Sequence, residues 1–235
     1  ATVTINPLPI AEISGTLEIC SGSSTTLTAS GGTSYEWSTG ATTAAITVGT
    51  AGDYTVTVTD GNGCVDEETV KVIVNDNPTV VAEDASVCLG ESIQLSATPA
   101  GGTWSGTGVS ATGLFDSSAL AAGGYEVTYS VTDANTCDGS DSATVTVNVL
   151  PEPVAQDASV CLGATVQLGA SPSGGIWSGT GVSPTGLFDT TGLPAGDYEV
   201  TYTVTDSNTC VGETTATVTI NPLPIAEISG ILEIC

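Results

Sequence analysis

The feature that most constrains this chain is that its sequence begins to repeat after 215 residues. Residues 216–235 read ATVTINPLPIAEISGILEIC, which is the sequence of residues 1–20 except that Thr16 is replaced by Ile231. A repeat with a fixed period indicates an architecture of similar units that follow one another along the chain. We therefore expect these 235 residues to be an internal slice of a longer repeated array.

A shorter repeat lies within the long one, at an offset of 73 residues. The motifs that recur are DASVCLG at 84–90 and 157–163, WSGTGVS at 104–110 and 177–183, TGLFD at 112–116 and 185–189, and YEVTY at 125–129 and 198–202. A looser copy precedes them, in which Cys20, Trp37, Tyr54 and Cys64 correspond to Cys88, Trp104, Tyr125 and Cys137. The sequence therefore predicts three consecutive domains of about 70 residues each.

Pro-rich segments separate the three predicted domains. They are Asn75-Asp-Asn-Pro78, Leu150-Pro-Glu-Pro153 and Asn221-Pro-Leu-Pro224. Pro stiffens a linker and cannot donate to a strand ladder, so it suits a boundary between β domains. The expected domain bounds are residues 8–77, 78–151 and 152–221. Residues 1–7 would end a preceding repeat, and residues 222–235 would start the next copy of the first domain.

Each predicted domain has the pattern of β structure. In residues 125–132, Tyr and Val alternate with Glu, Thr and Ser, which is the period of a half-buried strand. Val145, Val147 and Val149 repeat this alternation in the last strand, and Gly-rich turns separate the segments. No stretch shows a helical period over three turns. We predict an all-β fold, a tandem array of small antiparallel sandwiches of about seven strands each.

The strands can be assigned by analogy with immunoglobulin-like (Ig-like) sandwiches. Residues 87–92 resemble the turn between strands A and B, and Trp104 falls on strand C. Tyr125 and Tyr198 open strand F at a tyrosine corner, and residues 132–137 then form the F–G turn. The three Trp could offer stacking platforms for sugars. One Trp per domain at the strand C position instead favours a core side chain.

The charge composition excludes several classes of partner. The chain has 26 acidic side chains, a single basic one, Lys71, and no His, which gives a formal charge of −25. Without a basic surface we expect no binding to nucleic acid or anionic lipid. Without His there is no imidazole base or imidazole zinc ligand, and no apolar run approaches the roughly 20 residues that insert into a membrane. We expect no catalytic activity and no cofactor, because no carboxylate pair stands beside an aromatic cleft.

Two sequence patterns carry a family resemblance. Residues 20–64 contain Cys-x-Gly followed by Leu-x-Ala, then Tyr-x-Trp-Ser-x-Gly-Ala-Thr-Thr, then Ala-Gly-Asp-Tyr-x-Val-x-Val-x-Asp-x-Asn-Gly-Cys. Residues 101–116 and 174–189 contain Gly-Gly-x-Trp-Ser-Gly-x-Gly-Val and Gly-x-Phe-Asp. The chain resembles the PKD-like and Ig-like repeats of very large surface proteins in Bacteroidota. This resemblance implies secretion, commonly by the type IX route, an extracellular, cell-surface location, and service in adhesin stalks or gliding-associated surface filaments.

The cysteines offer two pairing schemes. They are Cys20, Cys64, Cys88, Cys137, Cys161, Cys210 and Cys235. A bacterial surface location permits disulfides, and the absence of His and of Cys-x-x-Cys argues against zinc. Pairing within each domain would give 20–64, 88–137 and 161–210, which leaves Cys235 for the next unit. Pairing between neighbouring domains would give 20–137 and 88–210, with Cys64, Cys161 and Cys235 bonded to repeats beyond this slice.

The expected strand positions favour pairing between domains. The A–B and F–G turns lie at opposite ends of an Ig-like sandwich, and strand F, residues 54–60, spans about 20 Å. A disulfide needs Cα atoms within about 7 Å. The end of strand G leads instead to the next domain beside its F–G turn, so Cys20 should face Cys137 and Cys88 should face Cys210. Each joint would then carry a disulfide beside its Pro linker, while the scheme within domains stays open.

Acidic residues and hydroxyl side chains suggest two further sites. The acidic residues that crowd the predicted joints are Asp60, Asp76, Glu83, Asp84, Asp133, Asp138, Asp141, Asp157 and Asp206. They could bind calcium, although a soluble, self-repelling surface explains them as well and no EF-hand spacing occurs. Asp141-Ser-Ala143 and Asp189-Thr-Thr191 match a short O-glycan acceptor pattern of this bacterial group, which makes Ser142 and Thr190 candidate acceptors.

Together these observations predict a structural role. We expect a repeat unit of a long extracellular surface filament or adhesin stalk, stiffened covalently by disulfides. Its expected partners are the neighbouring repeats of the same chain, with edge strands available for lateral self-association and surface glycans bound by domains outside this slice. The alternative is a spacer or a carbohydrate-binding module of a secreted polysaccharide-degrading enzyme. The near-identity over a 215-residue period favours the filament.

Overall fold

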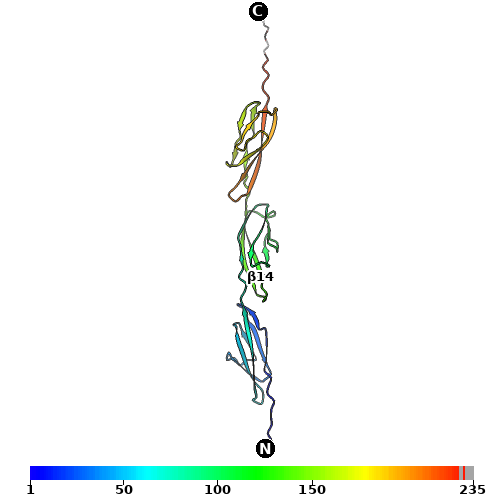
Figure 1. Cartoon of the computed structure of the whole chain (residues 1–235), viewed down its shortest axis with the longest axis vertical. Coiled ribbons are helices and arrows are strands. Elements are labelled where there is room, and N and C mark those ends of the chain that lie inside the picture. Colours follow the sequence, from blue (N-terminus) through cyan, green and yellow to red (C-terminus); the bar gives the residue numbers. More distant parts are fainter. Residues whose placement is uncertain (228–229, 231–235) are drawn as a thin grey trace, which may run out of the picture. The chain divides into compact units, whose positions relative to one another are not determined.

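The computed structural model describes residues 1–227 and residue 230, and every regular element in this part of the chain is a β-strand (Figure 1). The longer strands alternate buried Val and Tyr side chains with more exposed polar ones, as β14 (Gly123–Thr132) does. The predicted all-β class is therefore confirmed. Among the described residues, no helix is long and apolar enough to cross a membrane.

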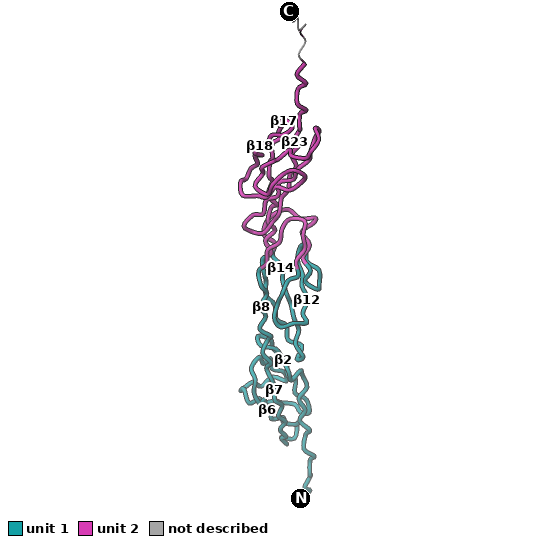
Figure 2. The backbone as a smooth tube through the Cα atoms, turned by 45° about the horizontal axis from the view of Figure 1, so that its top comes forward, with its two compact units in different colours: residues 1–84, 94–114, 126–144 teal, residues 85–93, 115–125, 145–235 magenta. Residues whose placement is uncertain are grey.

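The chain forms two compact units, which Figure 2 separates by colour. Unit 1 comprises residues 1–84, 94–114 and 126–144. Unit 2 comprises residues 85–93, 115–125 and 145–235. The division runs through the strands of the second predicted domain, and the predicted bounds of the three domains stay a prediction.

The first strand set, β1 to β7, lies in unit 1 and forms two sheets. Its strands are β1 (Glu12–Ser14), β2 (Glu18–Cys20), β3 (Thr25–Ser30), β4 (Ser34–Trp37), β5 (Ala45–Val48), β6 (Gly52–Thr59) and β7 (Val65–Asn75). One sheet has the order β1-β3-β5 and the other β2-β7-β6-β4. Side chains of both sheets, among them Leu27, Trp37 and Val72, meet in one buried cluster. This set is therefore a β-sandwich with Ig-like strand order.

The second and third strand sets repeat this arrangement with one strand more. The second set contains β8 (Val81–Ala82), β9 (Ala85–Cys88), β10 (Ser92–Gln94), β11 (Ala97–Thr98), β12 (Thr103–Gly106), β13 (Leu114–Asp116), β14 and β15 (Asp138–Asn148). The third set contains β16 (Val154–Ala155), β17 (Ala158–Cys161), β18 (Thr165–Gln167), β19 (Ala170–Ser171), β20 (Ile176–Gly179), β21 (Leu187–Asp189), β22 (Gly196–Thr205) and β23 (Val211–Asn221). Their four-stranded sheets have the orders β12-β14-β15-β9 and β17-β23-β22-β20. Two-stranded sheets complete each set, β8 with β11 and β10 with β13 in the second, β16 with β19 and β18 with β21 in the third.

The sheets are not purely antiparallel, which corrects the expectation from the sequence. β2 pairs in parallel with β7, β9 with β15, and β17 with β23. The cause is a divided first strand, because β1, β8 and β16 pair antiparallel in one sheet before the chain crosses to the other. After the crossing, the second half of the strand runs alongside the last strand of its set.

The aromatic residues take the positions that the sequence predicts. Trp37, Trp104 and Trp177 are 2%, 5% and 4% exposed, so they are core side chains and offer no platform for a sugar. The Tyr125 hydroxyl donates to the carbonyl oxygen of Ala121 at 2.8 Å, and the Tyr198 hydroxyl donates to that of Pro194 at 3.0 Å. These hydrogen bonds confirm the tyrosine corners.

The last strand of the second set ends earlier than the Val alternation predicts. Val145 and Val147 are buried, but Val149 is 63% exposed because β15 ends at Asn148. Val149 therefore belongs to the linker and not to the strand.

Candidate functional site at the cysteine joints

Two cysteines lie at strand ends beside the last residue of a neighbouring strand. Cys20 ends β2 and is in register with Asn75, the last residue of β7. Cys88 ends β9 and is in register with Asn148, the last residue of β15. The next backbone N–H extends each ladder, since Ser21 donates to Asn75 at 2.8 Å and Leu89 donates to Asn148 at 2.9 Å. Parallel pairing thus fixes each cysteine beside the point where the chain leaves its strand set.

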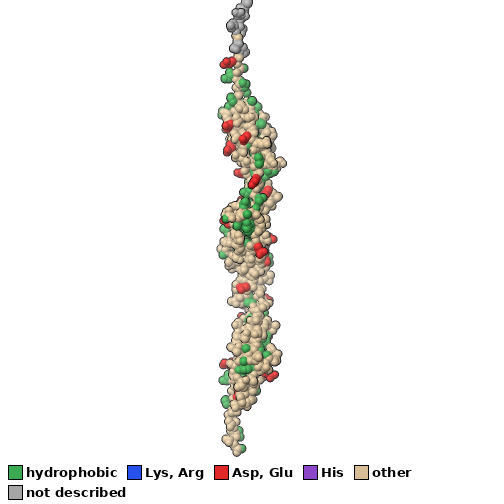
Figure 3. Space-filling model, turned by 180° about the vertical axis from the view of Figure 1, so that it is seen from behind, with side chains coloured by type: hydrophobic (Ala, Val, Ile, Leu, Met, Phe, Trp, Pro, Cys, Tyr) green, Lys and Arg blue, Asp and Glu red, His purple; other side chains and the backbone are tan. Residues whose placement is uncertain are grey.

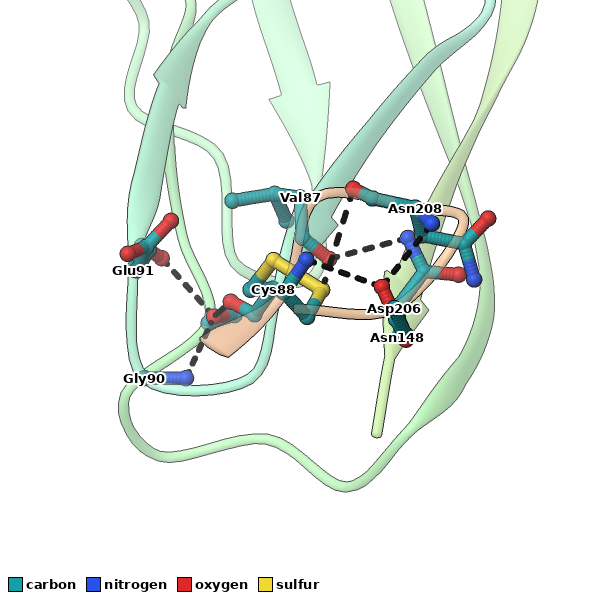
Figure 4. Close-up of a disulfide and its surroundings, with 9 residues drawn as sticks. Val87, Cys88, Gly90, Glu91, Asn148, Asp206 and Asn208 are labelled. Atoms are coloured by element: carbon teal, nitrogen blue, oxygen red, sulfur yellow. Dashed lines mark hydrogen bonds between the residues drawn. A yellow bond between two sulfur atoms is a disulfide. The ribbon is translucent and has the colours of Figure 1, made fainter. Parts of the chain in front are cut away.

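Two other cysteines close tight loops ahead of a last strand. In the loop 133–137, the Asp133 carboxylate accepts the backbone N–H groups of Asn135 at 2.8 Å and Cys137 at 2.9 Å. In the loop 206–210, Asp206 accepts those of Asn208 at 2.8 Å and Cys210 at 2.9 Å (Figure 4). An Asp that binds its own loop backbone in this way holds the turn in one conformation.

The residue before each loop cysteine adopts a left-handed backbone conformation. Its φ is 63° at Thr136, 67° at Thr209 and 82° at Gly63. A β-branched residue with positive φ is uncommon and persists only where the surroundings impose it. The Asp side chain supplies that constraint by holding the loop from both sides of this residue.

The structure brings together the pairs of the scheme between domains. Cys20 is joined to Cys137, within unit 1, and Cys88 is joined to Cys210, within unit 2, each with a Cα–Cα distance of 5.5 Å. Figure 4 shows the second of these disulfides. Cys137 and Cys210 are fully buried, so water has little access to their sulfur atoms. We call the first bond with its linker 76–80 joint 1, and the second with its linker 149–153 joint 2.

Cys64 and Cys161 occupy the same positions in their strand sets as the bonded cysteines do in theirs. Among the described cysteines, Cys64 and Cys161 carry no disulfide, and Cys161 is exposed. Cys64 closes a loop in which Asp60 accepts its backbone N–H at 2.9 Å, and Cys161 ends β17 in register with Asn221. Cys235 lies outside the described residues, so its predicted bond to a further repeat stays a prediction.

Hydrogen bonds within the Asp60 loop affect the pKa of the Asp60 carboxyl. The backbone N–H of Cys64, with further donors from Asn62 and Gly63, lowers the pKa of the Asp60 carboxyl below its ordinary value. Hydrogen bonds to a carboxylate favour its charged form. The loop is therefore held best when Asp60 is ionised.

Amide side chains complete the two joints differently. At joint 2, Asn148 Nδ2 donates to the carbonyl oxygen of Val87 at 3.5 Å (Figure 4). At joint 1, Asn77 Nδ2 donates to the carbonyl oxygen of Ser21 at 3.4 Å, while the buried Nδ2 of Asn75 has no hydrogen-bond partner among the described residues. The linker residues of joint 1 are thus tied to the turn that follows Cys20.

Three of the acidic residues at the joints accept backbone N–H groups of their own strand sets. Asp141 accepts the N–H of Ala82 at 2.9 Å, and Asp84 accepts that of Thr144 at 2.7 Å. Asp157 accepts the N–H of Thr217 at 2.8 Å in the same way. In the described part of the chain, no three acidic or cysteine side chains gather as a metal site would require. On the face drawn in Figure 3, acidic side chains are dispersed and not gathered into one patch.

The two candidate glycan acceptors have different surroundings. Ser142 is exposed on β15. Thr190 is 1% exposed, and its Oγ1 accepts the Gly163 N–H and donates to the Ala164 carbonyl oxygen, both at 2.8 Å. A glycan on this buried oxygen is incompatible with the fold, which overturns Thr190 as a candidate. Ser142 stays a prediction.

A buried hydroxyl beside joint 2 escapes the sequence reasoning. Ser117, the counterpart of Thr190 at the 73-residue offset, is fully buried. Its Oγ lies 2.7 Å from the Glu91 carbonyl oxygen and accepts the Gly90 N–H at 3.0 Å. It therefore fixes the turn that follows Cys88. The recurrence of a hydroxyl residue directly after the repeated TGLFD motif was the available signal.

Comparison with known proteins gives structural likenesses of low identity. No family model and no curated protein match the chain. A solved structure of a 1.5-MDa bacterial ice-binding adhesin is 13% identical over 93% of this chain and 99% of that one, with a TM-score of 0.40. A Ca²⁺-stabilised adhesin of an Antarctic bacterium is 14% identical over 90% and 74%, with a TM-score of 0.41. The fibronectin(III)-like modules of Clostridium thermocellum CbhA are 12% identical over 65% and 100%, with a TM-score of 0.33. Likenesses at this level do not define a function for this chain.

Proposed function

We propose that this chain is a structural repeat unit of a long extracellular filament or adhesin stalk, and that its joints are closed by disulfides. The observation that carries the proposal is the placement of the two bonds. Each one links the strand end of one set, Cys20 or Cys88, to the loop before the last strand of the next set, Cys137 or Cys210.

The mechanical consequence is a second covalent connection at each joint. A linker of a few residues leaves neighbouring domains free to move relative to each other, even when Pro stiffens it. A disulfide in parallel with the linker closes a short ring and removes most of that freedom. Tension is then shared between linker and disulfide, so bending and local opening at the joint are both opposed. This role needs no catalytic group.

The disulfides also support the proposed location. Structural disulfides persist in oxidising environments, which include bacterial cell surfaces. We assign the chain to the surface of a bacterium of the Bacteroidota, with type IX secretion as the export route, on the strength of the motif resemblance. Cys64, Cys161 and Cys235 would bond to neighbouring repeats, which continues the same device along the array.

Linker cleavage tests the second connection directly. Residues on either side of Asp76, an exposed linker residue, are substituted to create a site for a sequence-specific protease without changing the length of the linker, and the folded chain is cut there. We expect the two fragments to stay joined under non-reducing conditions through Cys20–Cys137 and to separate after reduction. The matched control, Cys20→Ala/Cys137→Ala with the same protease-site substitutions, should separate without reductant. If the cut protein with both cysteines separated into two fragments without reductant, the proposal would be contradicted.

A further inference from the structure

A glycine stands two residues after each bonded loop cysteine, and the backbone of the preceding linker passes close to it. Gly139 follows Cys137, and a Cβ there would overlap the Pro78 carbonyl oxygen and lie 2.9 Å from Val80 Cγ2. Gly212 follows Cys210, and a Cβ there would overlap the Pro151 carbonyl oxygen and lie 3.0 Å from Pro153 Cδ. Neither glycine has a positive φ, so the backbone conformation does not require glycine at these positions. Close approach of the linker does require it.

The linker contact and the disulfide form one short ring of the same size at both joints. At joint 2 the ring runs from Cys88 to its register partner Asn148, along three residues to Pro151, across to Gly212, and back two residues to Cys210. Joint 1 has the same spacings, from Cys20 through Asn75 to Pro78, then to Gly139 and Cys137. The position of the linker on the last strand therefore determines how closely the two sulfur atoms approach.

In the first strand set, the residue two positions after the loop cysteine also contacts the preceding linker, but through a hydrogen bond. Asp66 stands two residues after Cys64, and its Oδ2 accepts the backbone N–H of Ala11 at 2.9 Å. Residues 6–11 precede this set, and residues 221–226, which start at the last residue of the third set, have the same sequence. The residue two positions after the loop cysteine thus lies against the linker in all three strand sets.

We propose that Gly139 and Gly212 are linker seats, that is, positioning residues that dock the linker backbone and thereby direct Cys20 to Cys137 and Cys88 to Cys210. Seven cysteines in one chain allow many pairings, and the seat selects among them by raising the effective concentration of one thiol at its partner. The inference rests on the proposed function of the joints, since it concerns how their disulfides form.

The reaction that the seat assists is thiol–disulfide exchange with a low-molecular-weight disulfide such as oxidised glutathione. One cysteine thiolate attacks a glutathione sulfur, which forms a mixed disulfide and releases one glutathione thiolate. The partner cysteine thiolate then attacks the protein sulfur of that mixed disulfide and releases the second glutathione. Two protein thiols are oxidised, one glutathione disulfide is reduced to two glutathione molecules, and the thiol protons pass to solvent or to the leaving thiolates.

The experiment measures each bond separately in the full chain. Wild type, Gly212→Ala and Gly139→Ala are equilibrated in glutathione redox buffers, free thiols are alkylated, and the oxidised fraction of each pair is read by mass spectrometry. We expect Gly212→Ala to lower the equilibrium constant of Cys88–Cys210 by at least about tenfold and to leave Cys20–Cys137 unchanged. Gly139→Ala should show the reverse. Gly169→Ala is the matched control, because its added Cβ meets nothing within 4 Å and its φ is not positive.

Several outcomes would overturn the seat. These are an unchanged bond in both seat variants, or an equal loss of both bonds in a seat variant that still folds. If Gly212→Ala does not fold, a Gly-Ser insertion between Val149 and Leu150 displaces Pro151 without adding a Cβ at the seat, and it must weaken the same bond. Absence of both bonds from oxidised wild type would contradict the proposed function itself, whereas intact bonds with insensitive variants would contradict the seat alone.

Discussion

Removal of the Cys88–Cys210 disulfide should destabilise one part of the molecule by a defined amount. The bond closes a loop with a sequence separation of 122 residues. The loop-entropy relation gives about 5 kcal/mol for a loop of this length. Replacement of both cysteines by Ala leaves no free thiol from this pair, and the buried position of Cys210 adds a small cavity that acts in the same direction.

The loss should appear as a fall in melting temperature for the strand sets that the bond links. For a folded segment of some 150 residues, about 5 kcal/mol corresponds to roughly 10–20 °C. Differential scanning calorimetry of Cys88→Ala/Cys210→Ala measures this shift. Hydrogen exchange read by mass spectrometry then locates it, with the loop 206–210 losing most protection and the strands β3 to β6 of the first set keeping theirs.

A single-cysteine variant supplies the control. Cys161 is exposed and carries no disulfide among the described residues, so Cys161→Ala should change the free energy of unfolding by no more than about 0.5 kcal/mol. The reasoning would be refuted if the double variant and this control had the same melting temperature. It would also be refuted if exchange in the first strand set rose as much as exchange beside joint 2.

Three further predictions concern the sandwiches and their loops. The Asp60 carboxylate accepts the Cys64 N–H, which keeps the pKa of Asp60 in the folded state below its ordinary value. The ionised carboxylate therefore stabilises the folded state fully above about pH 4, and this stabilisation is lost as the pH falls through the lowered pKa. A melting temperature that does not change between pH 5 and pH 2 would contradict this prediction. Phe188 is completely buried in the third set, so Phe188→Ala should lower the free energy of unfolding by about 3–5 kcal/mol in denaturant titration. Trypsin should leave the folded chain intact for hours, because the one basic residue of the chain, Lys71, lies in β7 and pairs with Asp53 of β6. Fast cleavage seen by electrophoresis would contradict this prediction.

The sandwiches could be predicted because their long strands carry a strong period. Burial alternates along β14 and β22 as the Tyr and Val pattern predicts, and one Trp per set occupies the core. The parallel pairing of β2, β9 and β17 could not be predicted. These segments have three or four residues, which is too short to show a period, and their pairing depends on where the first strand crosses between sheets.

The joints were accessible to sequence reasoning through geometry and not through the cysteine count. Cys20 and Cys64 were expected at opposite ends of strand F, too far apart for a disulfide, and in the structure Cys20 is bonded to Cys137. The linker seats could not be predicted, because the sequence shows only that Gly139 and Gly212 each stand two residues after a cysteine and not that a linker backbone approaches them. The prediction of Thr190 as a glycan acceptor was wrong because a short acceptor pattern carries no information on burial.

Disulfide mapping on the native, unreduced protein tests the central claim most directly. The chain is cleaved at Asp and Glu, because a single Lys gives trypsin almost no sites, and the bridged peptides are identified by mass spectrometry. The account predicts peptides that join Cys20 to Cys137 and Cys88 to Cys210. Peptides that join 20 to 64, 88 to 137 and 161 to 210 would contradict it, because each domain would then be bridged only internally and the joints would be held by their linkers alone.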